Sequence, residues 1–65
     1  MLDWRTHSPS ELYADIPGRS YRLLRMGSFW YASRRIVGLD NNWVIIKQRL
    51  YLADIKSACE IDAKI

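Results

Sequence analysis

Arginine and aromatic side chains are concentrated in the middle of this sequence, where their chemistry suits the binding of anions. Residues 19–49 contain seven cations, six of them Arg, against one carboxylate, Asp40, which gives a net charge of +6. Residues 1–18, with one cation and three acids, carry −2, and residues 50–65, with two cations and three acids, carry −1. The planar fork of Arg suits phosphate, carboxylate or a stacked base better than Lys does. The central segment predicts a nucleic-acid partner; the alternative is a solvated surface paired with the acidic flanks.

The residue types that most often carry catalysis or bind metals are too few to form a site. His7 is the only histidine, and no acidic cluster lies near it at ligand spacing. Cys59 falls on the apolar stripe of a predicted helix, which favours a buried structural thiol over a nucleophile. The three glycines are isolated, so the sequence has no phosphate-cradling loop. We therefore predict a protein that is not an enzyme and that holds no metal or other cofactor.

A predicted β-hairpin would gather cations and aromatic rings on one surface. If Asn41 and Asn42 form a two-residue loop, the residue numbers of two paired positions add up to 83. Arg34 then lies directly opposite Arg49. Such like charges repel, and a polyanion would relieve the repulsion. The same face would also carry Trp30, Trp43, Lys47 and Tyr51, and the opposite, core face would carry Phe29, Tyr31, Ile46 and a lone Arg35.

Two alternatives to an open basic and aromatic face stay open at this point. In the first, the C-terminal helix covers the face, and Trp30, Trp43 and Tyr51 belong to the core. In the second, the register slips by one residue, which would exchange the two faces of the strand.

The elements that would position these side chains form a small α+β fold. Ser-Pro-Ser-Glu at residues 8–11 has the pattern of a capping box and predicts a short N-terminal helix that ends before Pro17-Gly18. Apolar spacing near 3.6 predicts a C-terminal helix from about Ala53. A two- or three-stranded antiparallel meander lies between them, with strands at residues 21–26, 29–37 and about 43–52. A helix from Asn42 to the end competes with the third strand.

Length and composition predict one domain over residues 1–65. With 49% apolar residues and eight aromatics the chain is not disordered, but its stability is marginal, so self-association or a partner is expected. The longest apolar runs are four residues, which predicts no membrane association. A single cysteine allows no internal disulfide and fits a reducing, cytoplasmic location.

The sequence therefore predicts a small, non-enzymatic nucleic-acid-binding module. Phosphates would be held by Arg22, Arg34, Lys47 and Arg49, and bases would stack on Trp30, Trp43 or Tyr51. The alternative function is a small inhibitor or adaptor whose Arg and Trp residues bind an acidic protein surface. A third hypothesis is a homo-oligomer that buries the aromatic face against itself.

Overall fold

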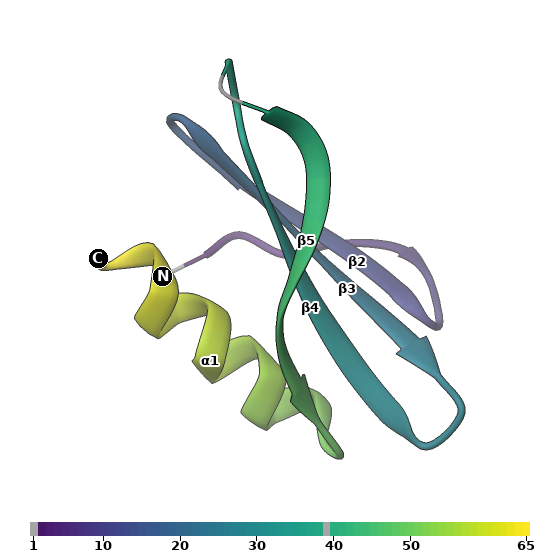
Figure 1. Cartoon of the computed structure of the whole chain (residues 1–65). Coiled ribbons are helices and arrows are strands. Elements are labelled where there is room, and N and C mark those ends of the chain that lie inside the picture. Colours follow the sequence, from purple (N-terminus) through teal and green to yellow (C-terminus); the bar gives the residue numbers. More distant parts are fainter. Residues whose placement is uncertain (1, 39) are drawn as a thin grey trace.

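The computed structural model describes residues 2–38 and 40–65, with the side chains of all of these except 40 and 41. Its elements are β1 Arg5–Ser8, β2 Glu11–Ile16, β3 Arg19–Met26, β4 Phe29–Ile36, β5 Asp40–Arg49 and α1 Leu52–Ala63. The strands form one antiparallel sheet in the order β1-β2-β3-β4-β5, so each strand pairs with its neighbours in the sequence. Figure 1 shows this meander, with α1 lying against one of its faces.

Glycine closes the two hairpins in the middle of the sheet. Gly18 between β2 and β3 has a φ of 84°, and Gly27 between β3 and β4 has a φ of 63°. Residues with a Cβ rarely adopt a positive φ, so glycine is the residue that suits these tight turns. The resulting registers are regular along the whole length of β3.

The hydrophobic core lies between α1 and the sheet face that it covers. Ala14 of β2 and Ala32 of β4 are fully buried, and their small side chains leave room for the helix. Ile55 and Cys59, one helical turn apart, are the fully buried side chains that α1 contributes. Burial, together with the nearby Asp62 and Glu60 carboxylates, raises the pKa of Cys59 to about 12, so this thiol stays protonated. The described residues include no helix with the length and apolarity that crossing a bilayer requires.

The predicted N-terminal helix is wrong, and so is the limit of two or three strands, because residues 5–16 form β1 and β2. Leu12 and Ala14 are buried while their neighbours are not, which is the alternation of a strand with one covered face. The Ser8 hydroxyl accepts a hydrogen bond from the Ser10 N–H at 3.3 Å, so it stabilises a turn instead of capping a helix. The C-terminal helix is present and begins at Leu52, one residue before the predicted start.

The predicted register of the last hairpin is also wrong. The chain turns near Gly38, whose φ is 83°, so Asn41 and Asn42 lie inside β5 instead of forming the loop. Arg34 therefore faces Val44, and Arg49 faces Trp30. Two irregularities in the β4–β5 ladder shift the pairing further along the strands. The competing helix from Asn42 onward is excluded as well, since residues 40–49 are a strand.

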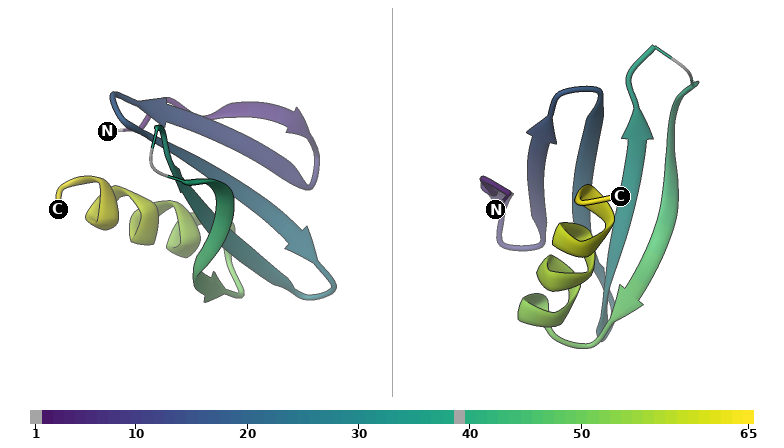
Figure 2. Two further views of the ribbon diagram at one scale, coloured as in Figure 1. Left: turned by 45° about the horizontal axis from the view of Figure 1, so that its top comes forward. Right: turned by 90° about the vertical axis from the view of Figure 1, so that its left-hand side faces the viewer.

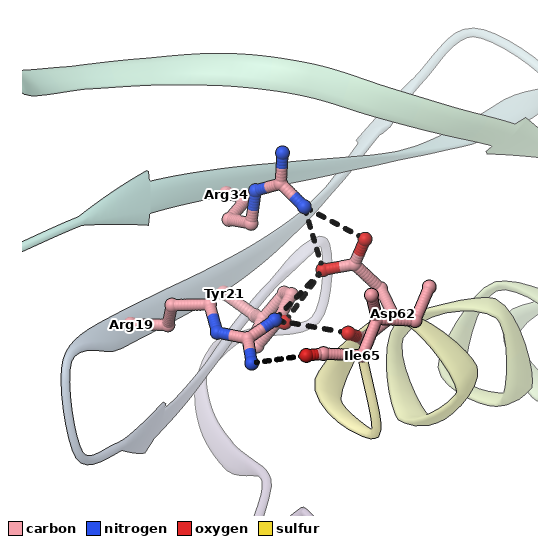
Figure 3. Close-up of polar contacts among 5 residues, drawn as sticks. All are labelled: Arg19, Tyr21, Arg34, Asp62 and Ile65. Carbon is pink, nitrogen blue, oxygen red and sulfur yellow. Dashed lines mark hydrogen bonds and ion pairs between the residues drawn. The ribbon is translucent and has the colours of Figure 1, made fainter.

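Asp62 near the end of α1 fastens the helix to the sheet (Figure 3). The Tyr21 hydroxyl donates to Asp62 Oδ2 at 2.6 Å, and Arg34 donates to Oδ1 at 2.8 Å and to Oδ2 at 3.0 Å. Arg19 donates to the Asp62 carbonyl at 2.9 Å and so satisfies a backbone acceptor at the end of the helix. Two cations on neighbouring strands thereby fix where α1 ends on the sheet.

The protonation of Asp62 reflects these contacts. Burial alone would raise its pKa, but the hydrogen bonds from Tyr21 and Arg34 and the charges of Arg34 and Arg19 outweigh burial and lower it. In turn, burial and the bond to Asp62 raise the pKa of Tyr21 to about 12. A carboxyl whose pKa is lower in the folded state stabilises the fold above its unfolded pKa, and that stabilisation is lost as the pH falls.

Substituting Asp62→Asn is expected to lower the free energy of unfolding at pH 7 by about 2 kcal/mol, because charged hydrogen bonds are replaced by weaker ones. The difference between wild type and variant should shrink as the pH falls from about 4 through the lowered pKa of Asp62. Urea unfolding at several pH values measures both quantities. The matched control is Asp3→Asn, which removes an exposed carboxylate that forms no ion pair among the described side chains and should show neither effect. Equal loss in both variants would contradict this role of Asp62.

Candidate binding site on the open face

The open face is the sheet face turned away from α1, and no other element of the described chain covers it (Figure 2). Its side chains alternate along each strand with the buried ones. Two neighbouring rows across β2, β3 and β4 consist of Tyr13, Arg22 and Ser33, and of Asp15, Ser20 and Arg35. Trp43 of β5 belongs to the same face. The open face therefore combines cations, aromatic rings and small hydroxyl side chains.

Trp43 is the centre of this arrangement. The guanidinium carbons of Arg22 and Arg35 each lie 4.8 Å from the centroid of its ring. Ser33 stands between Arg22 and β5, and because it is small, the indole can reach across it toward β3. The Tyr13 ring meets the indole at 6.2 Å and 61°, an edge-to-face contact. Four strands thus supply side chains to one cluster, which we call the Trp43 cluster: Tyr13, Arg22, Ser33, Arg35 and Trp43.

The carboxylates of the open face are already engaged with other groups. Asp15 forms an ion pair with Arg5, and a hydrogen bond from Ser20 helps most to lower the Asp15 pKa. Glu11 accepts a hydrogen bond from Tyr13, which raises the pKa of that phenol, and Glu11 Oε1 lies 4.0 Å from His7 Nε2.

The two stacked arginines differ from these paired groups. Arg35 is close enough to Asp15 to lower its pKa slightly. Among the described side chains, however, neither Arg22 nor Arg35 forms an ion pair with a carboxylate. Both guanidinium groups lie over the indole and both side chains are half-buried; Arg22 Nε is buried without a hydrogen-bond partner.

The seven predicted binding residues divide between the two sides of the sheet. Arg22 and Trp43 meet in the Trp43 cluster. Trp30, only 8% exposed, belongs to the core under α1, and Arg34 on the same side is bound to Asp62. The other three residues are exposed on β5 or directly before α1, namely Lys47, Arg49 and Tyr51. The predicted single face, with Arg34 beside Arg49, is therefore not formed.

Three members of the cluster, Tyr13, Ser33 and Arg35, are absent from the binding residues predicted from the sequence. Tyr13 was assigned to a helix, although the alternation of apolar and polar residues in 11–16 is the signal of a strand. Arg35 was placed on a core face, and an unpaired charge in a core is itself a sign that the register is wrong. Both signals were present but were outweighed by turn and capping motifs.

Comparison with known proteins adds no functional information. No family model, no curated protein and no solved structure matches the chain. The geometry of the open face is therefore the basis for inferring a function.

Arg22 and Trp43 should show a measurable coupling energy, because a cation held over an indole is stabilised by the ring's π electrons. In a double-mutant cycle with Arg22→Gln and Trp43→Leu, we expect a coupling of about 0.5–1 kcal/mol in urea unfolding. The pair Lys56→Gln and Trp43→Leu, in which the cation lies on α1 instead, should give additive effects. A cycle without coupling between Arg22 and Trp43 would show that the stack does not form.

Proposed function

We propose that this protein is a small, non-enzymatic nucleic-acid-binding module and that the Trp43 cluster is its contact site. The observation that carries the proposal is the pair of guanidinium groups, each 4.8 Å from one indole centroid and without a carboxylate partner among the described side chains. A guanidinium that stacks on a ring keeps its terminal NH2 groups at the edge of its plane, where a phosphate can accept two hydrogen bonds from them; the buried Nε of Arg22 takes no part in this. The stack also holds each side chain in place before the ligand binds.

The charge balance of the whole chain supports an anionic ligand. The formal net charge is +3, and ion pairs inside the fold engage Asp15 and Asp62. Arg25, Lys47 and Arg49 add exposed positive charge on the neighbouring strands. A field of this sign attracts polyanions and raises the rate at which they associate.

Removing both stacked charges should weaken nucleic-acid binding and reduce its dependence on salt. For Arg22→Gln/Arg35→Gln we expect at least a tenfold loss of affinity at low salt. The slope of log K against log salt should become less negative by about 1.8, since each phosphate contact contributes about 0.9. Fluorescence anisotropy with labelled DNA across a salt series measures both, and urea unfolding verifies that the variant folds.

Two further variants test whether position and shape matter, not only charge. Lys56→Gln/Lys64→Gln removes the same charge from α1 on the other side of the sheet and should retain nearly full affinity. Arg22→Lys/Arg35→Lys keeps the charge but loses the planar stack, and its affinity should lie between wild type and the glutamine variant. If the α1 variant loses as much as the open-face variant, the open face is not the site.

A second candidate function, binding to a protein, is favoured by exposed apolar side chains on the same face as the Trp43 cluster. Met26, Phe29 and Ile45 on the open face are 50%, 37% and 58% exposed. Together with Trp and Arg they resemble the composition of interface hot spots.

Nuclease treatment of a lysate distinguishes the two candidate functions. If the open face binds nucleic acid, proteins recovered with the tagged chain from a lysate should disappear after nuclease treatment. A protein partner would survive nuclease and would be lost in Phe29→Ser, whereas Ser57→Ala, an exposed position on α1, would retain it.

A further inference from the structure

Cationic groups lie on both sides of the sheet beside its edge strand β5. On the open side, Trp43 holds Arg22 and Arg35. On the other side project Lys47 and Arg49, which are the register partners of Ala32 and Trp30 on the face that α1 covers. We call Arg22 and Arg35 the open-face pair, and Lys47 and Arg49 the edge pair.

The edge pair is accessible to a ligand. Lys47 and Arg49 are exposed, and within the described residues neither forms an ion pair. Arg49 donates one hydrogen bond, to the Gln48 carbonyl at 2.7 Å, which leaves its other donors unused by that contact. In Figure 2 (right), α1 lies over the middle strands of the sheet and β5 runs along the edge beside it.

The aromatic rings at the open-face pair are engaged by neighbouring side chains. Two guanidinium groups lie over the Trp43 ring. Tyr13 makes edge-to-face contacts with both Trp43 and His7, at 6.2 and 5.9 Å. Binding to single strands depends on free ring faces on which successive bases stack. The groups presented here are instead donors for phosphates, and a duplex exposes its phosphates while its bases stay stacked inside.

The edge of the sheet is comparable in thickness with the major groove of DNA. Packed sheets lie about 10 Å apart, so one sheet with its side chains is about that thick, and the two pairs of cations lie on its opposite sides. The major groove of B-form DNA is about 12 Å wide between its backbones and admits a β-ribbon. From Trp43 to Arg49 the strand rises roughly 20 Å, or about six base-pair steps at 3.4 Å each. The major groove of A-form RNA is too deep and narrow for the same fit.

We propose that the ligand is double-stranded DNA, with β5 in its major groove and the open-face and edge pairs on the two phosphate backbones. This inference rests on the proposed nucleic-acid function and names the form of nucleic acid that the same site takes. Four phosphate contacts, one for each cation, imply a salt slope of about −3.6.

The test compares a labelled DNA duplex of about 12 base pairs, roughly twice the ~20 Å site, with its single strand and with an RNA duplex of the same sequence. We expect the DNA duplex to bind at least tenfold more tightly than either. Lys47→Gln/Arg49→Gln should weaken duplex binding at least tenfold and bring the slope to about −1.8. Lys56→Gln/Lys64→Gln should leave both nearly unchanged. A duplex with bulky groups on pyrimidine C5, which project into the major groove, should bind at least tenfold more weakly.

Several results would overturn the inference while leaving the proposed function intact. One is a single strand or an RNA duplex that binds as tightly as the DNA duplex. Another is an edge-pair variant whose salt slope is unchanged while the open-face variant loses affinity, and a third is full affinity for the C5-modified duplex. Loss of single-strand affinity in Phe29→Ala, with duplex binding weaker, would also overturn it, since stacking would then be the binding mode. If no nucleic acid binds at low salt, the proposed function fails as well. Urea unfolding of each variant separates loss of binding from loss of fold.

Discussion

The contact between Asp62 and the sheet determines which surface of this protein is available. A helix of 12 residues with two fully buried apolar side chains, Ile55 and Cys59, has limited hydrophobic contact with the strands. The carboxylate adds directional bonds from Tyr21 and Arg34 at the far end of the same helix. Because these groups lie on one side of β3 and β4, α1 covers that side. The opposite side has no second layer in the described chain.

In this arrangement two consecutive arginines of β4 have different partners. Arg34 and Arg35 are adjacent in the sequence, yet consecutive side chains of a strand point to opposite faces. Arg34 is bound to Asp62 in the fold, whereas Arg35 stacks on Trp43 on the open face. One consequence is that the basic character of the central segment does not translate into a single basic patch. Some of the charge stabilises the fold, and the remainder lies on both sides of the β5 edge.

The irregular pairing of β5 is what brings Trp43 into contact with the stacked arginines. The ladder with β4 shifts between Ala32 and Ser33 and again between Arg34 and Ile36. Such shifts change which side chains of the longer strand meet a given partner, and they increase the local twist. Here they bring the indole next to the guanidinium groups of Arg22 and Arg35, which stand on two other strands. The same irregularity and the cations of β5 also discourage edge-to-edge pairing with another sheet.

The sequence by itself determined the α+β composition, the C-terminal helix, the breaks at Pro17-Gly18 and at Gly27, and the buried state of Cys59, because local spacing and turn chemistry fix these features. Arg22 and Trp43 are both among the binding residues predicted from the sequence, and the structure brings them into contact. The helix predicted for residues 8–16 is wrong, because a local capping motif competed there with a two-residue alternation that only sheet pairing stabilises. The register of β5 and the division of the cations between two faces were decided by the tertiary structure. Both depend on ladder irregularities and on the docking of α1 through Asp62, contacts between residues far apart in the chain that no local pattern encodes.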